Sequence, residues 1–372
     1  MTFPFTVAIT NSESLESPGG VSRVLRELLQ RWQASVLYEV ARFTSLPLPI
    51  VRDYPYGLKV PPGVNVVYLP RTGGAFALRQ LGIPSVVTVH DVGFWDCPAD
   101  VQALGWKREL ILPHFRGLRY ASLVAVDSEF TGARLKALIP DLASKIRVVH
   151  LGVSRVFSDW SMTREESLRA VRIYIPGICG SPLVIYAGDD APRKNLPLLL
   201  RVFRQVKQAY PEAQLIKVGP AKLAQDRRRT LQTLRDLKLI VGQDVLFLDK
   251  VDDPLLAALY TACDVFVSAS LYEGFGLPPI EAMATGTPAV VTNCGAFPEI
   301  VGGAAILAEP EEQSMSSAIL SLLNQSSQSP SSDELKRFAR RYSWDKAAQQ
   351  YLNLFYEVTK SRDADLLASQ SQ

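Results

Sequence analysis

Cysteine is scarce in this chain of 372 residues, and its distribution excludes the usual cysteine-based sites. The four cysteines are scattered, and no two of them form a Cys-x-x-Cys pair: Cys97, Cys179, Cys263 and Cys294. This pattern disfavours a structural zinc site or a disulfide framework. It fits a reducing environment, so we expect a cytoplasmic protein.

Long apolar runs and strong charge are also absent. No stretch of about 18 apolar residues occurs, so we expect no membrane-spanning helix. Residues 1–5 carry no basic segment before a long apolar core, and no signal peptide is expected. The net charge of +3 is too small to indicate nucleic-acid binding. Gly-x-Gly-x-x-Gly occurs nowhere, which counts against a nicotinamide cofactor.

The sequence does contain strand-like runs that alternate with helical patterns. In the second half, strands are expected at 183–187, 215–218, 245–248 and 265–269. Between them, 196–209 has the period of an amphipathic helix. This alternation predicts parallel sheets with helices on both faces. Residues 154–180 contain no strong strand and are interpreted as a linker between two domains.

The strand at 265–269 leads into a glycine loop flanked by two acids. Gly274 and Gly276 allow backbone amides to approach a ligand, and a helix is expected from Ile280 to Ala284. A glycine loop before a helix N-terminus forms an anion site. Glu273 and Glu281 are poor phosphate ligands but suit the hydroxyl groups of a nucleotide-sugar. Taken singly, each acid is equally explained as a solvated or helix-dipole residue.

The whole string from Glu273 is more specific: Glu-Gly-Phe-Gly-Leu-Pro-x-x-Glu-Ala-Met-Ala-x-Gly-x-Pro-Ala-Val-Val. It resembles the paired-glutamate signature of the retaining family 4 glycosyltransferases, also called glycosyl transferases group 1. The resemblance implies the GT-B fold, an α/β arrangement of two Rossmann-like parallel-sheet domains facing a central cleft. Residues 1–165 would bind the acceptor and 175–350 the nucleotide-sugar. A C-terminal helix at about 350–372 would pack back on the first domain.

The resemblance also implies roles for residues of the second domain. Glu281 would bind the ribose hydroxyls, and Glu273 would hold donor-sugar hydroxyls near the reacting centre. Arg193 and Lys194, for which a surface basic pair is the alternative, would neutralise the departing diphosphate and so act in catalysis. The other expected donor-binding residues supply glycine or backbone contacts: Gly188, Gly274, Phe275, Gly276 and Leu277.

Two features of the first half fit the same family. A continuous apolar strand at 85–89 ends in His90 and Asp91, where open parallel sheets bind ligands. By resemblance, His90 is catalytic beside the reacting sugar, and both residues lie on the acceptor side; a structural histidine is the alternative. Gly19 and Gly20 precede a helical pattern and, by resemblance, approach the donor phosphates; an ordinary turn is the alternative.

Neither a metal nor another cofactor is expected beyond the nucleotide-sugar co-substrate. Asp-x-Asp, the metal-binding mark of other glycosyltransferases, occurs once, at Asp363 and Asp365 near the C-terminus, where solvated charge explains it. Residues 105–121 form a basic, aromatic helix candidate. This segment predicts either peripheral contact with the inner face of a membrane or an ordinary packing helix.

The expected activity is transfer of a sugar, such as mannose or glucose, with retention at the anomeric carbon. The donor is a nucleotide-sugar, and the acceptor is a hydroxyl of a glycan or lipid-linked partner in polysaccharide or glycolipid assembly. Two alternatives remain open: a nucleotide-sugar epimerase on the same fold, and a non-catalytic nucleotide-sugar-binding protein.

Overall fold

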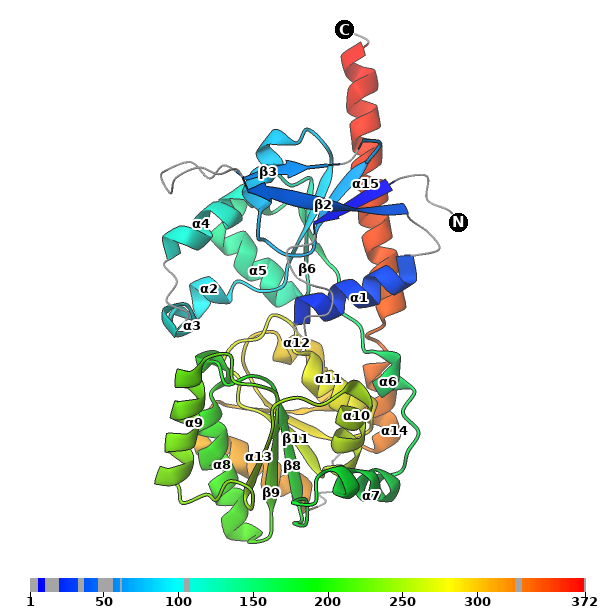
Figure 1. Ribbon diagram of the computed structural model, residues 1–372. Helices are drawn as coiled ribbons and strands as arrows, with labels where there is room; N and C mark the ends of the chain where they lie inside the picture. Colours follow the sequence, from blue (N-terminus) through cyan, green and yellow to red (C-terminus); the bar gives the residue numbers. More distant parts are fainter. Residues whose placement is uncertain are drawn as a thin grey trace. The chain divides into compact units, whose positions relative to one another are not determined.

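The computed structural model describes residues 6–10, 20–32, 37–45, 56–60, 62–103, 108–324 and 330–370. The chain forms two compact units (Figure 1). The first unit comprises residues within 1–92, 107–152 and 343–372, and the second comprises 93–106 and 153–342. Each unit contains one largely parallel sheet, so the expected α/β class with two Rossmann-like domains is confirmed.

The sheet of the first unit has the order β3-β2-β1-β4-β5-β6-β7. Its strands are β1 (Thr6–Thr10), β2 (Leu37–Ser45), β3 (Tyr56–Lys59), β4 (Val66–Leu69), β5 (Ser85–Val89), β6 (Leu123–Val126) and β7 (Ile146–Val148). All neighbours are parallel except β3, which pairs antiparallel with β2. Strands β4, β5 and β6 are buried along their whole length, which explains their continuous apolar sequence.

The last helix of the chain belongs to the core of the first unit. The helices here are α1 (Gly20–Trp32), α4 (Arg108–Gly117), α5 (Glu129–Leu138) and α15 (Trp344–Gln370). The indole Nε1 of Trp32 donates to the Ala348 carbonyl at 3.2 Å. The Tyr351 hydroxyl lies 2.8 Å from Thr88 Oγ1 on β5. Helix α15 therefore connects α1 to the central strands.

The sheet of the second unit has the order β10-β9-β8-β11-β12-β13, with every pair parallel. Its strands are β8 (Leu183–Ala187), β9 (Gln214–Val218), β10 (Val245–Leu248), β11 (Val265–Ser268), β12 (Ala289–Thr292) and β13 (Ile306–Ala308). The strand order reverses between β8 and β11. In open parallel sheets, ligands bind outside the carboxyl ends of the strands at this switch point.

Helices cover both faces of this second sheet (Figure 1). Helices α8 (Leu196–Ala209), α9 (Ala224–Asp236) and α13 (Glu312–Leu323) share one hydrophobic core with Val184 and Val267. On the other face lie α10 (Asp253–Ala262) and α11 (Leu277–Ala284), where the Tyr260 ring contacts Phe266. Packed against them are α6 (Arg155–Ser158), α7 (Arg164–Tyr174) and α14 (Ser332–Ala339).

The units divide at 152/153 and 342/343 rather than at the expected 165–175 and 350. The segment interpreted as a linker, 154–180, is part of the second unit. Within it, the Phe157 ring lies 6.0 Å from that of Tyr260, and Arg164 forms an ion pair with Asp264 at 2.6 Å. These contacts join α6 to α10, and α7 to Asp264 directly before β11.

Helix α4 covers most of the segment considered for membrane contact. Phe115 is buried at 1% exposure and Leu118 is fully buried, whereas Arg116 and Arg119 are exposed. Trp106 and Lys107 lie outside the described residues. Within the described ranges, no helix is long and apolar enough to cross a membrane. The buried Phe115 contributes to the core, and membrane contact stays a prediction.

Candidate functional site

The donor-side candidates of the second unit meet at the carboxyl ends of β8 and β11. Arg193 and Lys194 lie in a short 3-10 helix (Pro192–Lys194) after β8, and Glu273 lies in the loop after β11. Leu271 N donates to the Arg193 carbonyl at 2.7 Å, which joins the two loops. Lys194 Nζ donates to Glu273 Oε1 at 2.6 Å, and both side chains are 13% exposed. The fold therefore brings these predicted residues together at the switch point.

Glu273 is held as a carboxylate. Burial by itself would raise its pKa, but the charges of Lys194 and Arg193 lower it. Hydrogen bonds from Lys194 and Ser270 lower it further, and the net result is a pKa below the ordinary value. An ionised carboxylate at this position is a strong acceptor for hydroxyl groups.

Arg193 has a carboxylate partner that the sequence did not indicate. Its backbone N donates to Asp100 Oδ1 at 2.9 Å, and its Nε lies 3.2 Å from Asp100 Oδ2. Asp100 lies in α3 (Pro98–Ala103), which belongs to the second unit and follows α2 (Gly93–Asp96). Both expected diphosphate cations are thus ion-paired here, so an incoming anion competes with Asp100 and Glu273 for them.

The helix after the glycine loop begins at Leu277, three residues earlier than expected. Gly276 caps it with φ 94°, and a Cβ there would lie 2.5 Å from Phe297 Cε1, so glycine is required. Pro278 and Pro279 occupy the first turn and have no N–H groups. The amides available to an anion are therefore mainly those of residues 274–276 and of Leu277, the first residue of the helix.

Two candidates near this loop are buried. Phe275 is 4% exposed, and its ring packs edge-on against Tyr342 at 5.4 Å, so any ligand contact comes from its backbone. Glu281 lies inside α11 at 3% exposure and accepts a hydrogen bond from the Tyr260 hydroxyl at 3.4 Å. Its proposed contact with ribose stays a prediction.

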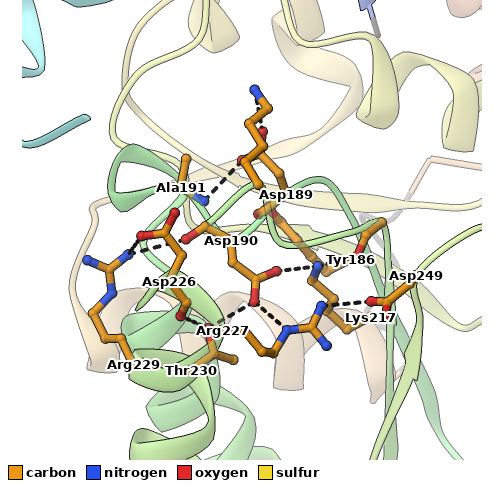
Figure 2. A network of polar contacts seen from close by, with 12 residues as sticks. Tyr186, Asp189, Asp190, Ala191, Lys217, Asp226, Arg227, Arg229, Thr230 and Asp249 are labelled. Atoms are coloured by element: carbon orange, nitrogen blue, oxygen red, sulfur yellow. Dashed lines mark hydrogen bonds and ion pairs between the residues drawn. The ribbon is translucent and has the colours of Figure 1, made fainter. Parts of the chain in front are cut away.

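A network of charged residues lies beneath the loop that carries Arg193 and Lys194 (Figure 2). Asp190 forms an ion pair with Lys217 of β9, and their side chains are 0% and 1% exposed. The other Asp190 oxygen accepts from Arg227 Nε at 3.0 Å and from Thr230 at 3.2 Å, both on α9. These contacts fix the loop to β9 and α9.

The neighbouring Asp189 completes the anchoring of this loop. Lys222 Nζ lies 2.8 Å from its carboxylate, and the Tyr186 hydroxyl donates to its carbonyl at 2.8 Å. Burial opposes ionisation, but Lys194, Lys222 and Arg193 lower the pKa of Asp189 to about 2. Gly188 packs here, since a Cβ would lie 2.5 Å from the Tyr186 hydroxyl; its donor role stays a prediction.

In the first unit, His90 follows β5 and contacts two neighbouring strand ends. Its Nδ1 lies 2.7 Å from Asp127 Oδ2, and its Nε2 lies 2.9 Å from the Pro70 carbonyl. Asp91 is partly buried beside it. Gly19 lies outside the described residues, and Gly20 is the first residue of α1.

The metal-independent interpretation is untested by this arrangement. In the ranges that the structure describes, no three His, Cys, Asp or Glu side chains group so that they could hold a metal ion. Asp363 and Asp365 lie within α15. Metal independence stays a prediction.

Sequence reasoning missed Asp100, Asp127, Asp190 and Lys217. A lysine inside the apolar strand Leu215–Val218 was a usable signal, because a buried lysine requires a partner. Asp127 also stood at a strand end, like His90. Asp100 carried no comparable signal.

Solved structures share this fold. Sucrose-phosphate synthase from Thermosynechococcus elongatus superimposes with a TM-score of 0.74 at 20% identity, covering 96% of this chain and 100% of that one. HepE from Anabaena, in complex with UDP and glucose, gives 0.74 at 18% identity, covering 95% and 99%. The chain has the architecture of the GT-B glycosyltransferases.

Sequence comparisons show which glycosyltransferases the chain is similar to. Residues 178–342 match the family model described as Glycosyl transferases group 1. O-antigen chain mannosyltransferase B from Escherichia coli is 29% identical over 280 residues, 73% of this chain and 70% of that protein. MMP alpha-(1->4)-mannosyltransferase from Mycolicibacterium hassiacum is 28% identical over 62% of this chain and 53% of that protein. The expected family resemblance is confirmed at the level of group 1 glycosyl transferases.

Proposed function

We propose that this protein is a retaining, metal-independent glycosyltransferase that moves a hexose from a nucleotide-sugar to a hydroxyl of a glycan or lipid-linked acceptor. The observation that carries the proposal is the meeting of Lys194, Arg193 and Glu273 at the strand-order switch of the second sheet. Cations there suit a diphosphate, and a carboxylate beside them suits sugar hydroxyls. The match of residues 178–342 to the group 1 family model supports the same class.

Mannose is the favoured donor sugar. Two relatives are named as mannosyltransferases, one of them acting in O-antigen chain formation. HepE, a neighbour in fold, was solved with UDP-glucose, so glucose is the second candidate. A role in polysaccharide assembly follows from the same relatives.

In this proposal, Arg193 and Lys194 stabilise the charge that develops on the departing diphosphate. Glu273 accepts hydrogen bonds from donor-sugar hydroxyls, and Glu281 from the ribose. The amides of residues 274–277 face the phosphates. Before the donor binds, Asp100 pairs with Arg193 and Glu273 pairs with Lys194, which keeps both cationic side chains in place.

The test is a thermal-shift screen against UDP-, GDP- and ADP-sugars, followed by turnover assays with the donor that binds. We expect a mannose donor to raise the melting temperature most and NMR to show a product with the donor's anomeric configuration. Activity should persist in excess EDTA. Isomerised donor would identify an epimerase, and binding with neither transfer nor donor hydrolysis would identify a non-catalytic binder.

A further inference from the structure

The second hydrogen bond of His90 restricts what the histidine can do. A carbonyl oxygen can only accept, so the Nε2 atom facing the Pro70 carbonyl at 2.9 Å carries a hydrogen. The other ring nitrogen, Nδ1, faces Asp127 Oδ2 at 2.7 Å. A hydrogen bond of that length between nitrogen and a carboxyl oxygen requires one more proton, held on either atom.

We propose that His90 and Asp127 hold this proton jointly and act as one unit, in which Asp127 is the positioning residue that keeps the His90 ring fixed. The unit keeps its proton through neutral pH. His90 is then a rigid hydrogen-bonded side chain at the carboxyl edge of the sheet, and it does not accept a proton from the acceptor hydroxyl.

The strand register explains why these two residues meet. Strands β5 and β6 are parallel neighbours, and Val89 is paired with Val126. The residues that follow, His90 and Asp127, therefore emerge side by side. Pro70 follows β4, the neighbour of β5 on its other side. The His90 ring is therefore held between the ends of β4 and β6, the two strands that flank β5.

Burial makes separation of the pair costly. The Asp127 side chain is 3% exposed and that of His90 is 18% exposed. Among the described residues, Asp127 Oδ1 is buried without a hydrogen-bond partner, so the carboxyl group depends on its contact with His90. Removing the shared proton would leave a buried carboxylate facing a neutral ring nitrogen, an unfavourable contact between two acceptors.

Among the surrounding titratable groups, Asp91 favours retention of the shared proton, whereas His150 opposes it. Burial would lower the pKa of His90, but the charge and hydrogen bond of Asp127, with the Pro70 carbonyl and Asp91, raise it. Burial raises the pKa of Asp127, and the charge of Asp91 raises it as well. His90 and His150 lower the pKa of Asp127, but the net result is a raised value. Tyr68 and Tyr351 also face Asp127, and their raised pKa values keep them neutral.

The direct test is nitrogen-15 NMR of the imidazole rings as a function of pH. The chain has three histidines, so His114→Gln and His150→Gln assign the signals. We expect the His90 signals to show no titration between about pH 6 and 8, where an ordinary histidine with pKa about 6.5 loses its proton. In Asp127→Asn, His90 should titrate below its ordinary value, because burial remains without the counter-charge. Asp91→Asn removes a nearby charge but keeps Asp127, so it should change the pKa of His90 less than Asp127→Asn does.

Titration of wild-type His90 near its ordinary pKa, or an unchanged spectrum in Asp127→Asn, would overturn the proposal. If Asp127→Asn does not fold, the wild-type titration alone decides. A kinetic arm rests on the proposed function: Asp127→Asn should lower kcat at least tenfold, leave donor KM within about threefold, and add a pH inflection to kcat. Absence of all transfer activity in wild type would defeat the proposed function while leaving the NMR result valid.

Discussion

The buried ion pair between Asp190 and Lys217 allows a sharp test of the loop anchoring. Lys217→Met keeps the length and volume of the side chain but removes the charge that faces Asp190. Breaking a buried pair by removing one partner costs about 3–5 kcal/mol. Arg227 Nε, at 3.0 Å, and Thr230 still bond to the other carboxylate oxygen, so we expect the lower end, about 3 kcal/mol.

The chain offers a matched control five residues further on. Lys222 pairs with Asp189 at 2.8 Å, but its side chain is 59% exposed, against 1% for Lys217. Exposed ion pairs contribute roughly 0–1 kcal/mol, so Lys222→Met should lose no more than that. The loss of stability caused by the same Lys→Met change should therefore differ by about 2 kcal/mol or more between the two sites.

The assay is urea unfolding followed by circular dichroism, with amide hydrogen exchange in β9. Local exchange is needed because two compact units need not unfold together. Equal losses of stability in Lys217→Met and Lys222→Met would refute the reasoning.

Four further predictions concern charge at the candidate site. In a transfer assay, Lys194→Ala should lower kcat by an amount that corresponds to a barrier about 2–4 kcal/mol higher. The loss of donor affinity should be smaller. By calorimetry, Glu281→Gln should weaken binding of the nucleoside diphosphate by roughly 1–3 kcal/mol. Glu273→Gln should leave that affinity unchanged or higher, because Lys194 loses a competitor, while turnover falls about a hundredfold. Asp189, whose pKa is about 2 rather than the ordinary 3.8, adds stability above pH 4 that is lost as the pH falls toward 2. In acid-unfolding measurements, the free energy of unfolding of Asp189→Asn should fall by about 2 kcal/mol less than that of the wild type between pH 4 and pH 2.

Local pattern was sufficient for much of the second unit. Strand β8 at Leu183–Ala187 and helix α8 at Leu196–Ala209 have the predicted bounds. Here apolar periodicity and the residues that interrupt it lie within one short segment. The start of α11 was misplaced because two prolines compatible with a first turn follow Gly276, and only the backbone shows that Leu277 already belongs to the helix.

The partners of the site residues could not be predicted in the same way. Asp100 reaches Arg193 across 93 residues of sequence, and nothing near Asp100 marks it as different from a solvated acid. Asp127 is a different case. Its place at a strand end was visible, but its contact with His90 depends on β5 and β6 being neighbours in register. Sequence pattern locates strand ends, whereas sheet order decides which of them meet.

The same feature occurs in both units: four of the charged candidates have an oppositely charged or proton-sharing partner. Lys194 is paired with Glu273, Arg193 with Asp100, and His90 with Asp127. Such pairing holds the side chains in place before any ligand binds, so little reorganisation remains for the transition state. It also reduces the gain from binding an anionic donor, because each new contact to Arg193 or Lys194 replaces an existing one. If the protein acts as proposed, such a site would favour stabilisation of the charge that develops on the leaving diphosphate over tight binding of the intact donor.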